Sequence, residues 1–467
     1  MPRVAISLGT SSNPGPYGYD GPGRLINAYA ESRGAEGRVP FPLYVIEGLE
    51  ALATLTGGAG VRAILALESY AIVVAGRLVF QVDEAGTATV LGGLPSDGPV
   101  YLARNRRSPN PQVAIVCDGT YLIASGGVLT TVSDSDLPPP SSVVCIDGYF
   151  VFSCSLGRMY ASGVDDGETI EALDFATAET SADALRCVAR RGRELVAVGE
   201  ASIEFWSNTG ETNFPFSRGQ SVEIGCLAGK TVQPIKQTLV FVSNQQDVRI
   251  LNGYTPEVIS NNAVNRFIRD TTDKSTLFAT SWASAGREFY ALSSPSGTWV
   301  FDASTGFWHE RKSHGQDRWR VSVVERLGDT LLAGDASTTS LYAMRPDVYA
   351  EGSDPIEWEI RAPMVHAFPS RMIMNALHVD AIPGVGLNTS DDDNETPRIM
   401  LDTSEDGGDT FGGERQISVG TINQKLTTVS AYRLGLIRAT GRVIRLRMSA
   451  DVVRGLMSAS ADLTRLG

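Results

Sequence analysis

The strongest constraint on this chain is a short apolar run that recurs seven times between residues 59 and 350. A turn follows each run, in most cases with a second, more alternating strand after it. The runs begin 42, 36, 45, 45, 50 and 41 residues apart, at 70–76, 112–119, 148–154, 193–199, 238–244, 288–294 and 329–335. A spacing of about 43 residues is typical of β-propeller blades, each a four-stranded sheet. The sequence therefore predicts an all-β protein with a β-propeller of about seven blades over residues 59–350.

An apolar run without alternation indicates a strand that is buried on both faces, and we assign it to the innermost position of each blade. Glycine is abundant, at 48 of 467 residues. The tight turns of each blade explain this abundance, because Gly adopts positive φ without strain. A large irregular β-sandwich is the alternative fold. One helix is expected over residues 262–270, with Asn261 or Asn262 as its N-cap.

Two different segments flank the repeats. Residues 1–58 are rich in Gly and Pro and show little periodicity, which predicts an extended N-terminal arm that packs along something larger. Residues 351–467 contain regularly alternating strands, which predict a C-terminal β-sandwich-like domain. Charge is polarised inside that domain: residues 380–409 hold nine acids and one base, whereas residues 432–467 hold seven Arg and two Asp.

The formal net charge of the chain is −13. This balance argues against a groove that grips nucleic acid, which needs a clustered basic surface. No apolar stretch reaches the roughly 18 residues of a membrane span, and the first residues do not have the pattern of a secretory signal. The cysteines are expected to be buried, reduced thiols, although a Cys145–Cys154 bridge is an alternative. They are Cys117, Cys145, Cys154, Cys187 and Cys226.

Motifs for phosphate and zinc binding are incomplete. The segment GCLAGKT at 225–231 lacks the first glycine of a phosphate loop, because Ile224 stands at that position. His309 and His314 are five residues apart, whereas two zinc ligands on one helical face need a separation of four. Nucleophile and base pairs are not recognisable either. We therefore expect a protein that is not an enzyme and has no cofactor or metal.

The acidic run at 391–395 begins like a calcium loop. Thr396, however, stands where the tight turn of such a loop needs Gly. A solvated acidic loop is therefore the preferred interpretation. Its carboxylates are Asp391, Asp392, Asp393 and Glu395.

The segment SEDGGDTF at 404–411 fits the Asp-box pattern of sialidase-type propellers. Asp406 is expected to accept backbone N–H bonds across a hairpin turn, with Ser404 and Thr410 completing the box. Gly408 would supply the turn and Phe411 would anchor in the core. In that pattern the box is structural, and here it occurs once, outside the expected propeller.

Several blocks resemble the packaged-DNA stabilisation proteins of short-tailed bacteriophages, which are also described as tail-hub or nozzle proteins. RLINAYAE (24–31) resembles the NLYPE segment of that family, and FPLYVIEGLEAL (41–52) resembles its LYPTPGL segment, with Ile46-Glu47 in place of Thr-Pro. Further similar blocks lie at 168–185, 193–218, 222–229, 252–260, 404–420 and 432–448. The motif residues carried over are Asn27, Tyr29, Glu31, Phe175, Glu204, Trp206, Thr209, Gly210, Phe214, Pro215, Phe216, Gly253 and Tyr254.

The resemblance implies a structural virion protein, made in the host bacterial cytoplasm and built into the phage tail. It implies a homohexameric ring below the portal that contacts the adaptor ring, the tail spikes or fibres and the tail needle, retains packaged DNA and takes part in genome ejection. Double-stranded DNA would pass without specific binding, because an acidic wall repels phosphate. The loop at 391–395 is a candidate for a channel-facing element, and the arm is a candidate for assembly contacts.

Two other functions stay open from the residues alone. One is a propeller-type carbohydrate-active enzyme, such as a sialidase-like glycan hydrolase, with carboxylates brought together from separate blades. The other is a generic propeller scaffold for protein interactions. For the arm, the alternative is a strap within the same chain that closes the propeller.

Overall fold

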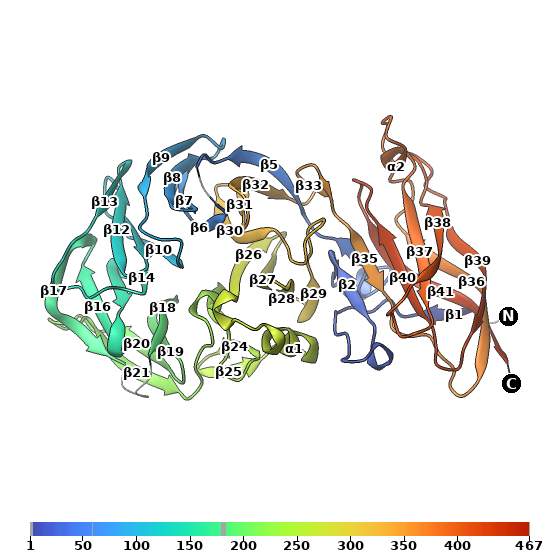
Figure 1. Ribbon diagram of the computed structural model, residues 1–467, viewed down its shortest axis with the longest axis horizontal. Coiled ribbons are helices and arrows are strands. Elements are labelled where there is room, and N and C mark those ends of the chain that lie inside the picture. The colour runs from blue at the N-terminus through green and yellow to red at the C-terminus, as the bar shows by residue number, and fades with distance from the viewer. Residues whose placement is uncertain (1–2, 58, 179–183, 467) are drawn as a thin grey trace.

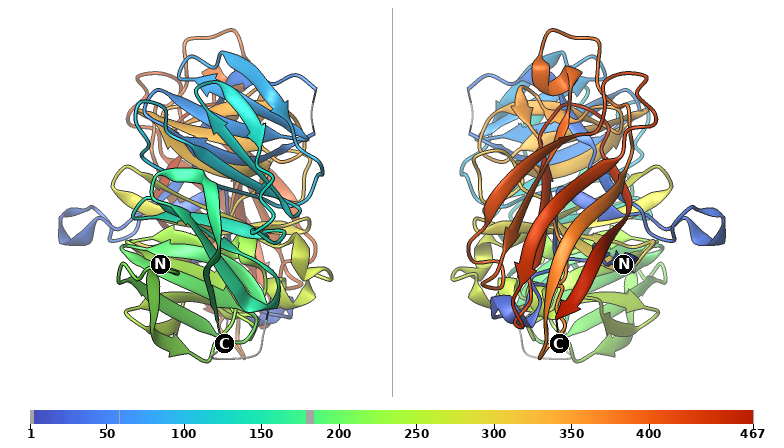
Figure 2. Two further views of the ribbon diagram at one scale, coloured as in Figure 1. Left: turned by 90° about the vertical axis from the view of Figure 1, so that its left-hand side faces the viewer. Right: turned by 90° about the vertical axis from the view of Figure 1, so that its right-hand side faces the viewer.

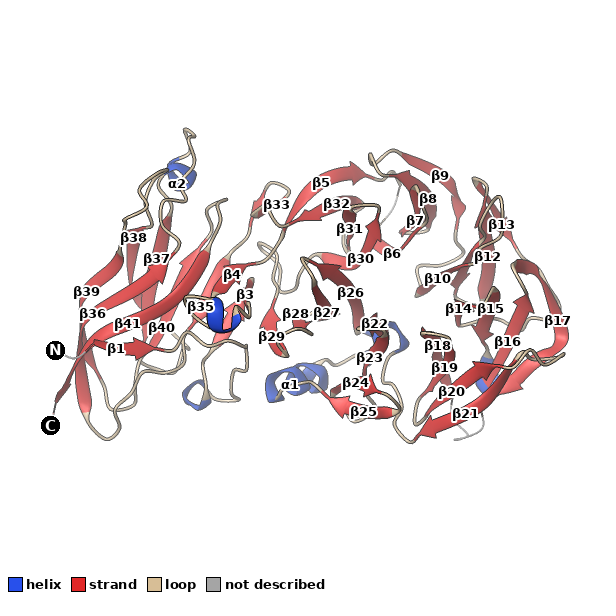
Figure 3. Ribbon diagram, turned by 180° about the vertical axis from the view of Figure 1, so that it is seen from behind, coloured by secondary structure: helices blue, strands red, loops and turns tan. Residues whose placement is uncertain are grey.

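The computed structural model describes residues 3–57, 59–178 and 184–466. A ring of small sheets lies beside a pair of packed sheets (Figure 1). Strands dominate both parts, and helix is confined to short pieces (Figure 3). The expected all-β fold, a propeller followed by a sandwich, is confirmed. Within the described ranges, the helices are all too short or too polar to cross a membrane.

Five blades of the propeller each use one contiguous stretch of chain. Their strands pair in chain order with antiparallel neighbours. Blade 1 is β6 (Val61–Ala66), β7 (Tyr70–Ala75), β8 (Leu78–Asp83) and β9 (Ala88–Gly93). Blade 2 is β10 (Val100–Arg104), β11 (Val113–Cys117), β12 (Thr120–Ser125) and β13 (Val128–Thr131). Blade 3 is β14 (Ser142–Ile146), β15 (Tyr149–Ser153), β16 (Arg158–Gly163) and β17 (Asp166–Thr177). Blade 4 is β18 (Leu185–Arg191), β19 (Glu194–Gly199), β20 (Ile203–Asn208) and β21 (Phe216–Val222). Blade 5 is β22 (Gln233–Ile235), β23 (Thr238–Val242), β24 (Val248–Asn252) and β25 (Thr255–Val258).

The last two blades take strands from the N-terminal segment. Blade 6 is β26 (Phe278–Ser284), β27 (Arg287–Ser294), β28 (Gly297–Asp302) and β29 (Phe307–Glu310). Beyond β29 its sheet continues into β2 (Arg24–Ile26). Blade 7 is β30 (Val321–Leu327), β31 (Thr330–Asp335), β32 (Ser340–Arg345) and, as its outer strand, β5 (Gly48–Thr54). The ring of seven blades therefore closes by pairing strands from opposite ends of the propeller sequence.

The seven apolar runs form the second strand of each blade, so their expected innermost position is wrong. The first strands line the central cavity instead. A second strand has a hydrogen-bonded neighbour on each side, and its two faces pack against different blades. In β7, for example, Ile72 and Val74 join a core with blade 2, whereas Ala71 and Val73 join a core with blade 7. Burial on both faces therefore selects for continuous apolar sequence at the second position.

The C-terminal domain is a sandwich of two sheets, and the alternating segments of residues 351–467 form seven of its strands. They are β35 (Trp358–Arg361), β36 (Arg371–Ala381), β37 (Arg398–Ser404), β38 (Gly412–Ser418), β39 (Val429–Ile437), β40 (Val443–Met448) and β41 (Gly455–Leu466). One sheet has the order β3-β4-β41-β36-β39, with β1 also paired to β41. The other continues the blade 6 sheet as β29-β2-β35-β40-β37-β38. Between blade 7 and the sandwich lie the two short strands β33 (Ala350–Glu351) and β34 (Asp354–Pro355).

The first 58 residues are therefore not a separate arm. Besides β2 and β5, they supply β1 (Arg3–Ile6), β3 (Ala28–Ala30) and β4 (Leu43–Val45) to the sandwich. Several of their apolar side chains, including Leu25 and Leu43, are buried in the sandwich core, whereas Leu49 and Leu55 are buried in cores of the propeller. The alternative of an intrachain strap describes this segment better. Periodicity could not reveal the strap, because each strand is only three to seven residues long.

One part of the strap stands away from the body. The hairpin between β3 and β4 carries the 3₁₀ turn Gly34–Glu36 at its tip and projects from the domain (Figure 2). Residues 32–36 are all exposed, and Arg38 reaches back to Asp380 at 3.0 Å. This projection is the part of the segment that keeps an arm-like character.

Helix α1 (Asn262–Asp270) begins and ends as expected. The side-chain oxygen of Asn261 accepts bonds from the N–H groups of Ala263 and Val264, which makes Asn261 the N-cap. Its amide also donates to the carbonyl of Ser12 at 2.8 Å. The Gly- and Pro-rich loop of the strap is thus fixed against blade 5 by a helix cap.

Candidate functional site

Asn27 joins the strap to both neighbouring parts of the molecule. Its side-chain amide donates to the carbonyl oxygens of Lys312 and Glu357, at 2.8 and 2.9 Å, and its side-chain oxygen accepts from the N–H of Lys312. The residue is 1% exposed and has a φ of +52°, a conformation that Asn tolerates better than most residues. Asn27, which corresponds to the Asn of the NLYPE segment, is therefore a buried structural junction.

Tyr29 and Glu31 extend this junction toward blade 6. Arg287 donates to the Tyr29 hydroxyl at 2.9 Å and approaches the Glu31 carboxylate at 3.5 Å. The guanidinium also lies 4.4 Å from the centre of the Tyr29 ring. Burial raises the pKa of Tyr29, with the charge of Arg287 opposing that effect. These motif residues hold the base of the projecting hairpin on the propeller.

A buried ion pair between Glu47 and Arg311 locks the strap at the point where β5 begins. The two charged groups are 3.0 Å apart, and the Arg311 side chain has no exposed surface. Its guanidinium lies over the neighbouring rings of Trp282 and Trp319, 4.9 and 4.8 Å from their centres. Although burial opposes ionisation, the charge and hydrogen bond of Arg311 keep the pKa of Glu47 below its usual value. Sequence reasoning missed this pair, but an acid inside the apolar run FPLYVIEGLEAL was a signal for it.

The blade 4 motif block forms the outer hairpin of that blade. Trp206 packs edge-on against Phe214, which contacts Phe216, and all three are buried. Pro215 bends the chain back so that its carbonyl oxygen accepts from the N–H groups of Thr209 and Gly210. Gly210 has a φ of +67° in this turn. The block is thus a packed hairpin whose turn is exposed.

The other motif residues of blades 3 to 5 also have structural contacts. Phe175 stacks on Tyr160, with ring centres 5.4 Å apart. Glu204 is 1% exposed and lies 3.6 Å from Arg218. These contacts hold each residue within its own blade.

Gly253 and Tyr254 connect blade 5 to blade 4 through hydrogen bonds and aromatic packing. The Tyr254 hydroxyl donates to Glu194 at 2.6 Å, and the ring packs against Phe205 and beneath Arg191. Arg191 also donates to the carbonyl of Gly253. This contact explains why a turn motif in blade 5 accompanies the motif block of blade 4.

The Asp-box forms a closed network of local hydrogen bonds. Asp406 accepts from the N–H groups of Asp409 and Thr410, at 3.1 and 3.0 Å, and from the hydroxyls of Ser404 and Thr410. The Ser404 hydroxyl accepts from the N–H of Gly408 at 2.8 Å. Hydrogen bonds from the two hydroxyls and the backbone lower the pKa of Asp406. The carboxylate is thus occupied by its own turn.

Phe411 does not anchor in the core as expected. It is partly exposed, and its ring lies between the guanidinium groups of Arg361 and Arg445, 5.4 and 3.9 Å from them. The sequence pattern could not show this, because both arginines come from distant strands. The aromatic residue of the box is held by cation–π contacts in place of apolar packing.

The acidic run forms a one-turn helix, α2 (Asp392–Glu395), at one end of the sandwich (Figure 1). Asp391 caps it by accepting from the N–H of Asp393 at 3.2 Å, and Arg398 donates to Asp392 at 3.1 Å. Asp391, Asp392, Asp393 and Glu395 are all exposed. The run is therefore a solvated acidic tip.

The polarised charge of the sandwich is largely paired across neighbouring strands. β37 and β40 are adjacent, with Asp402 opposite Arg445. Both Arg445 and Arg447 contact Asp402, and Arg447 also reaches Glu414 at 2.7 Å. The acidic and basic segments of the sequence thus lie side by side and form ion pairs. The carboxylates of the tip at α2 lie outside these pairs and are exposed.

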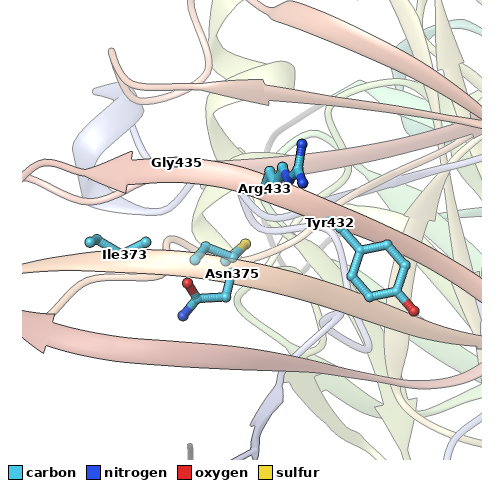
Figure 4. Close-up of a pocket in the computed structure, with 6 residues that line it drawn as sticks. Ile373, Asn375, Tyr432, Arg433 and Gly435 are labelled. Atoms are coloured by element: carbon cyan, nitrogen blue, oxygen red, sulfur yellow. The ribbon is translucent and has the colours of Figure 1, made fainter.

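A shallow pocket of about 710 Å³ lies on the outer face of the sandwich, beside a bulge between β36 and β39 (Figure 4). Ile373 and Asn375 line it from β36, and Tyr432 and Arg433 line it from β39. Tyr432 is 60% exposed, and Arg433 has a φ of +58°. Sequence patterns could not predict this pocket, because its bulge depends on the register of two distant strands.

Among the described residues, groups of His, Cys, Asp and Glu that could hold a metal ion are absent. All five cysteines are free thiols, so the Cys145–Cys154 bridge does not form. His309 is buried in blade 6, whereas His314 is exposed and bonds to Glu357 at 2.8 Å. The larger cavity, of about 730 Å³, lies along the propeller axis between the first strands of the blades.

Solved structures that match the chain include virginiamycin B lyase from Staphylococcus aureus, at 11% identity over 64% of this chain and 98% of that chain, with a TM-score of 0.46. The Cps50 (Swd1) propeller domain of Myceliophteria thermophila matches at 12% identity over 64% and 99%, with a TM-score of 0.46. The WD40 propeller domain of Doa1 matches at 10% identity over 64% and 96%, with a TM-score of 0.42. Likenesses this distant carry no argument about function. Among curated protein sequences, none matched.

Two family models match the chain. One, described as the β-propeller of bacteriophage P22 Gp10, covers residues 25–349, and the other, described as its β-sandwich, covers residues 357–464. These ranges contain the two parts seen in the structure, in the same order, and the first includes most of the strap. The chain therefore belongs to the bacteriophage P22 Gp10 family and is a structural phage protein.

Proposed function

We propose that this protein is the tail-hub or nozzle protein of a short-tailed phage. Six copies form a ring that extends the DNA conduit below the portal and adaptor. The ring helps to retain packaged DNA and supports the tail spikes or fibres and the needle during genome ejection. The observation that carries this proposal is the family match over both domains, from residue 25 to residue 464.

The charge of the chain supports the conduit role independently. Six copies carry a formal charge of 6 × −13 = −78. A wall of the same sign as DNA does not grip phosphate groups, so the genome slides past without the salt-dependent binding of a basic groove.

Electron microscopy of the purified protein mixed with the adaptor tests the ring directly. The proposal expects sixfold particles that bind the adaptor. Particles that stay monomeric at high protein concentration and in the presence of adaptor would contradict it.

The projecting β3–β4 hairpin is the natural element for contacts between copies or with the adaptor. Strands β1, β2 and β3 are part of the two sandwich sheets, so deletion of residues 1–30 is expected to damage the fold. The sharper variant replaces only residues 33–39 with a short Gly-containing turn. It should leave the thermal unfolding midpoint unchanged and abolish ring formation in micrographs. A stable variant that still forms normal rings would show that assembly uses another surface.

The acidic tip at α2 is proposed to face the DNA path. Asp391, Asp392 and Asp393 are replaced together by Ala, and genome release from purified virions is timed. Loss of these charges should slow release, because the wall then repels DNA less. The matched control removes three exposed acids from the propeller, Asp136, Glu223 and Asp347. Equal kinetics for the tip variant and the natural protein would exclude the tip from the path.

A further inference from the structure

Three cationic side chains line the propeller cavity at the end where the inner strands begin. Arg62 belongs to β6, Lys230 to the 3₁₀ turn Gly229–Thr231 before β22, and Arg318 to the segment before β30. In a chain with a net charge of −13, such a group of buried or half-buried cations needs an explanation. In the sequence, Lys230 belongs to the incomplete phosphate-loop segment GCLAGKT at 225–231.

Within the described chain, Arg62 and Lys230 form no ion pair with a carboxylate. Both donate hydrogen bonds to backbone carbonyl groups. The Arg62 guanidinium donates to the carbonyl oxygens of Gly76, Ser96 and Gly98. Lys230 donates to the carbonyl of Val100, across the cavity from its own blade. Carbonyl groups orient the cations but do not neutralise them.

Two carboxylates line the cavity, and neither pairs with these cations. Asp97 is paired with Arg77 at 3.0 Å, which largely offsets its charge. Glu325 lies further along β30, away from Arg318, and burial raises its pKa to about 7.

Arg318 has unused hydrogen-bonding capacity. Its Nε donates to the carbonyl of Trp319 at 3.1 Å, and its guanidinium lies 5.0 Å from the centre of the Phe278 ring. Its Nη2 is buried and has no hydrogen-bond partner among the residues that the structure describes. Burial lowers the pKa of Arg318, although the charge of Asp335 opposes this. An unpaired donor of this kind is costly unless something else binds it.

The cations converge on the same part of the cavity. The turn that carries Lys230 packs against β26, and Phe278 of β26 lies under the Arg318 guanidinium. Arg62 and Lys230 donate to the carbonyl groups of Gly98 and Val100, two residues apart in the chain, so the two cations lie close together. In keeping with this, burial and to a lesser degree the charge of Arg62 lower the pKa of Lys230 to about 8. Like charges brought together in a half-buried site are destabilising unless an anion lies between them.

We propose that this end of the propeller cavity binds a small oxyanion of the phosphate or phosphomonoester class, held between Lys230 and Arg318. The ammonium acts as a point charge and the free edge of the guanidinium donates hydrogen bonds, a combination that suits a tetrahedral, doubly charged group. Arg62 adds positive charge without direct contact. The cavity, at about 730 Å³, has room for an organic body beside the anion, against Tyr101, Leu277 and Phe278.

Calorimetric titration of the full chain at pH 7 and constant ionic strength tests the proposal. One arm uses inorganic phosphate and the other uses adenosine monophosphate, which distinguishes a bare anion from a phosphorylated small molecule. Saturable binding of at least one probe is expected. Lys230→Met and Arg318→Met should each weaken that binding about tenfold or more, whereas Lys230→Arg should retain it.

The matched control is Lys312→Met, which removes an exposed lysine outside the cavity. Thermal unfolding shows whether each variant is folded, and Arg318→Met, at a partly exposed position, provides a test even where Lys230→Met is unstable. An anion that binds here should also raise the unfolding temperature of the natural protein, but not of Arg318→Met. Absence of saturable binding to both probes, or equal affinity for the natural protein and Arg318→Met, would overturn the proposal.

Discussion

Blades 1 to 5 differ from the region formed by blades 6 and 7 with the sandwich in how the chain supplies the strands of each sheet. Each of the first five sheets is a local meander of one stretch of chain. The second region is held together by strap strands that pair with strands about 280 to 460 residues away in sequence, as where Gly48 pairs with Arg345 or Ala5 with Ser460. Both regions have apolar cores, but the second region also relies on buried polar contacts that hold the strap in place. Breaking one of these strap contacts should therefore cost more stability than breaking a contact within a local turn.

The largest effect should come from the Glu47–Arg311 pair. Glu47→Ala removes the carboxylate that is ion-paired with the buried Arg311 guanidinium and leaves it the weaker attraction of Glu351, which should cost about 3–5 kcal/mol of unfolding free energy. Chemical denaturation followed by circular dichroism measures this. The control is Glu50→Ala, which breaks an exposed pair with Arg345 and should cost about 1 kcal/mol or less. Because both acids belong to the strap, equal costs for the two variants would contradict a special role for the buried pair.

The same pair predicts a pH dependence. The pKa of Glu47 is lower in the folded protein than its usual value of 4.5, so the folded state favours the ionised form. Its contribution to stability is complete above that usual value and is lost as the pH falls through the lowered pKa. The difference in unfolding free energy between the natural protein and Glu47→Ala should therefore shrink in acid.

Asn27→Ala should have the next largest effect. It removes the donor from the carbonyl groups of Lys312 and Glu357 and the acceptor from the Lys312 N–H, at a cost of about 2–4 kcal/mol. Hydrogen exchange of the Lys312 amide should accelerate. Asn423→Ala is the control, because Asn423 has a similar φ of +71° but is exposed. A loss of stability no greater than that of the control would show that Asn27 is dispensable as a junction.

The smallest effect should come from Asp406→Asn in the Asp-box. Its hydrogen bonds all lie within residues 404–410, so only the local turn should loosen. Exchange of the Thr410 amide should accelerate while the global unfolding midpoint stays the same. Because the pKa of Asp406 is lowered, the turn should keep its protection until the pH falls below the usual carboxyl range. A fall in the midpoint similar to that of Asn27→Ala would remove the distinction between local and strap contacts.

The sequence predicted what is encoded locally. The apolar runs located seven blades, and alternation located the seven strands of the sandwich, because both patterns reflect burial within a few residues of chain. It could not assign the runs to the second strand, since the covering faces come from other blades. It could not predict the partners of Arg311 or Phe411 either, because those contacts depend on strands far away in sequence.

The sheet that runs from blade 6 through β2 into the sandwich has a mechanical consequence. A sideways load on the sandwich reaches the propeller through β2, which is bound to β35 by three residue pairs but to β29 by one, Ile26 with Glu310. The Arg24–Glu310 ion pair reinforces that seam. If the sandwich bends relative to the propeller, the strain should fall on this seam between β2 and β29. The seam therefore influences how stiffly the sandwich, and any protein bound to it, is coupled to the ring of blades.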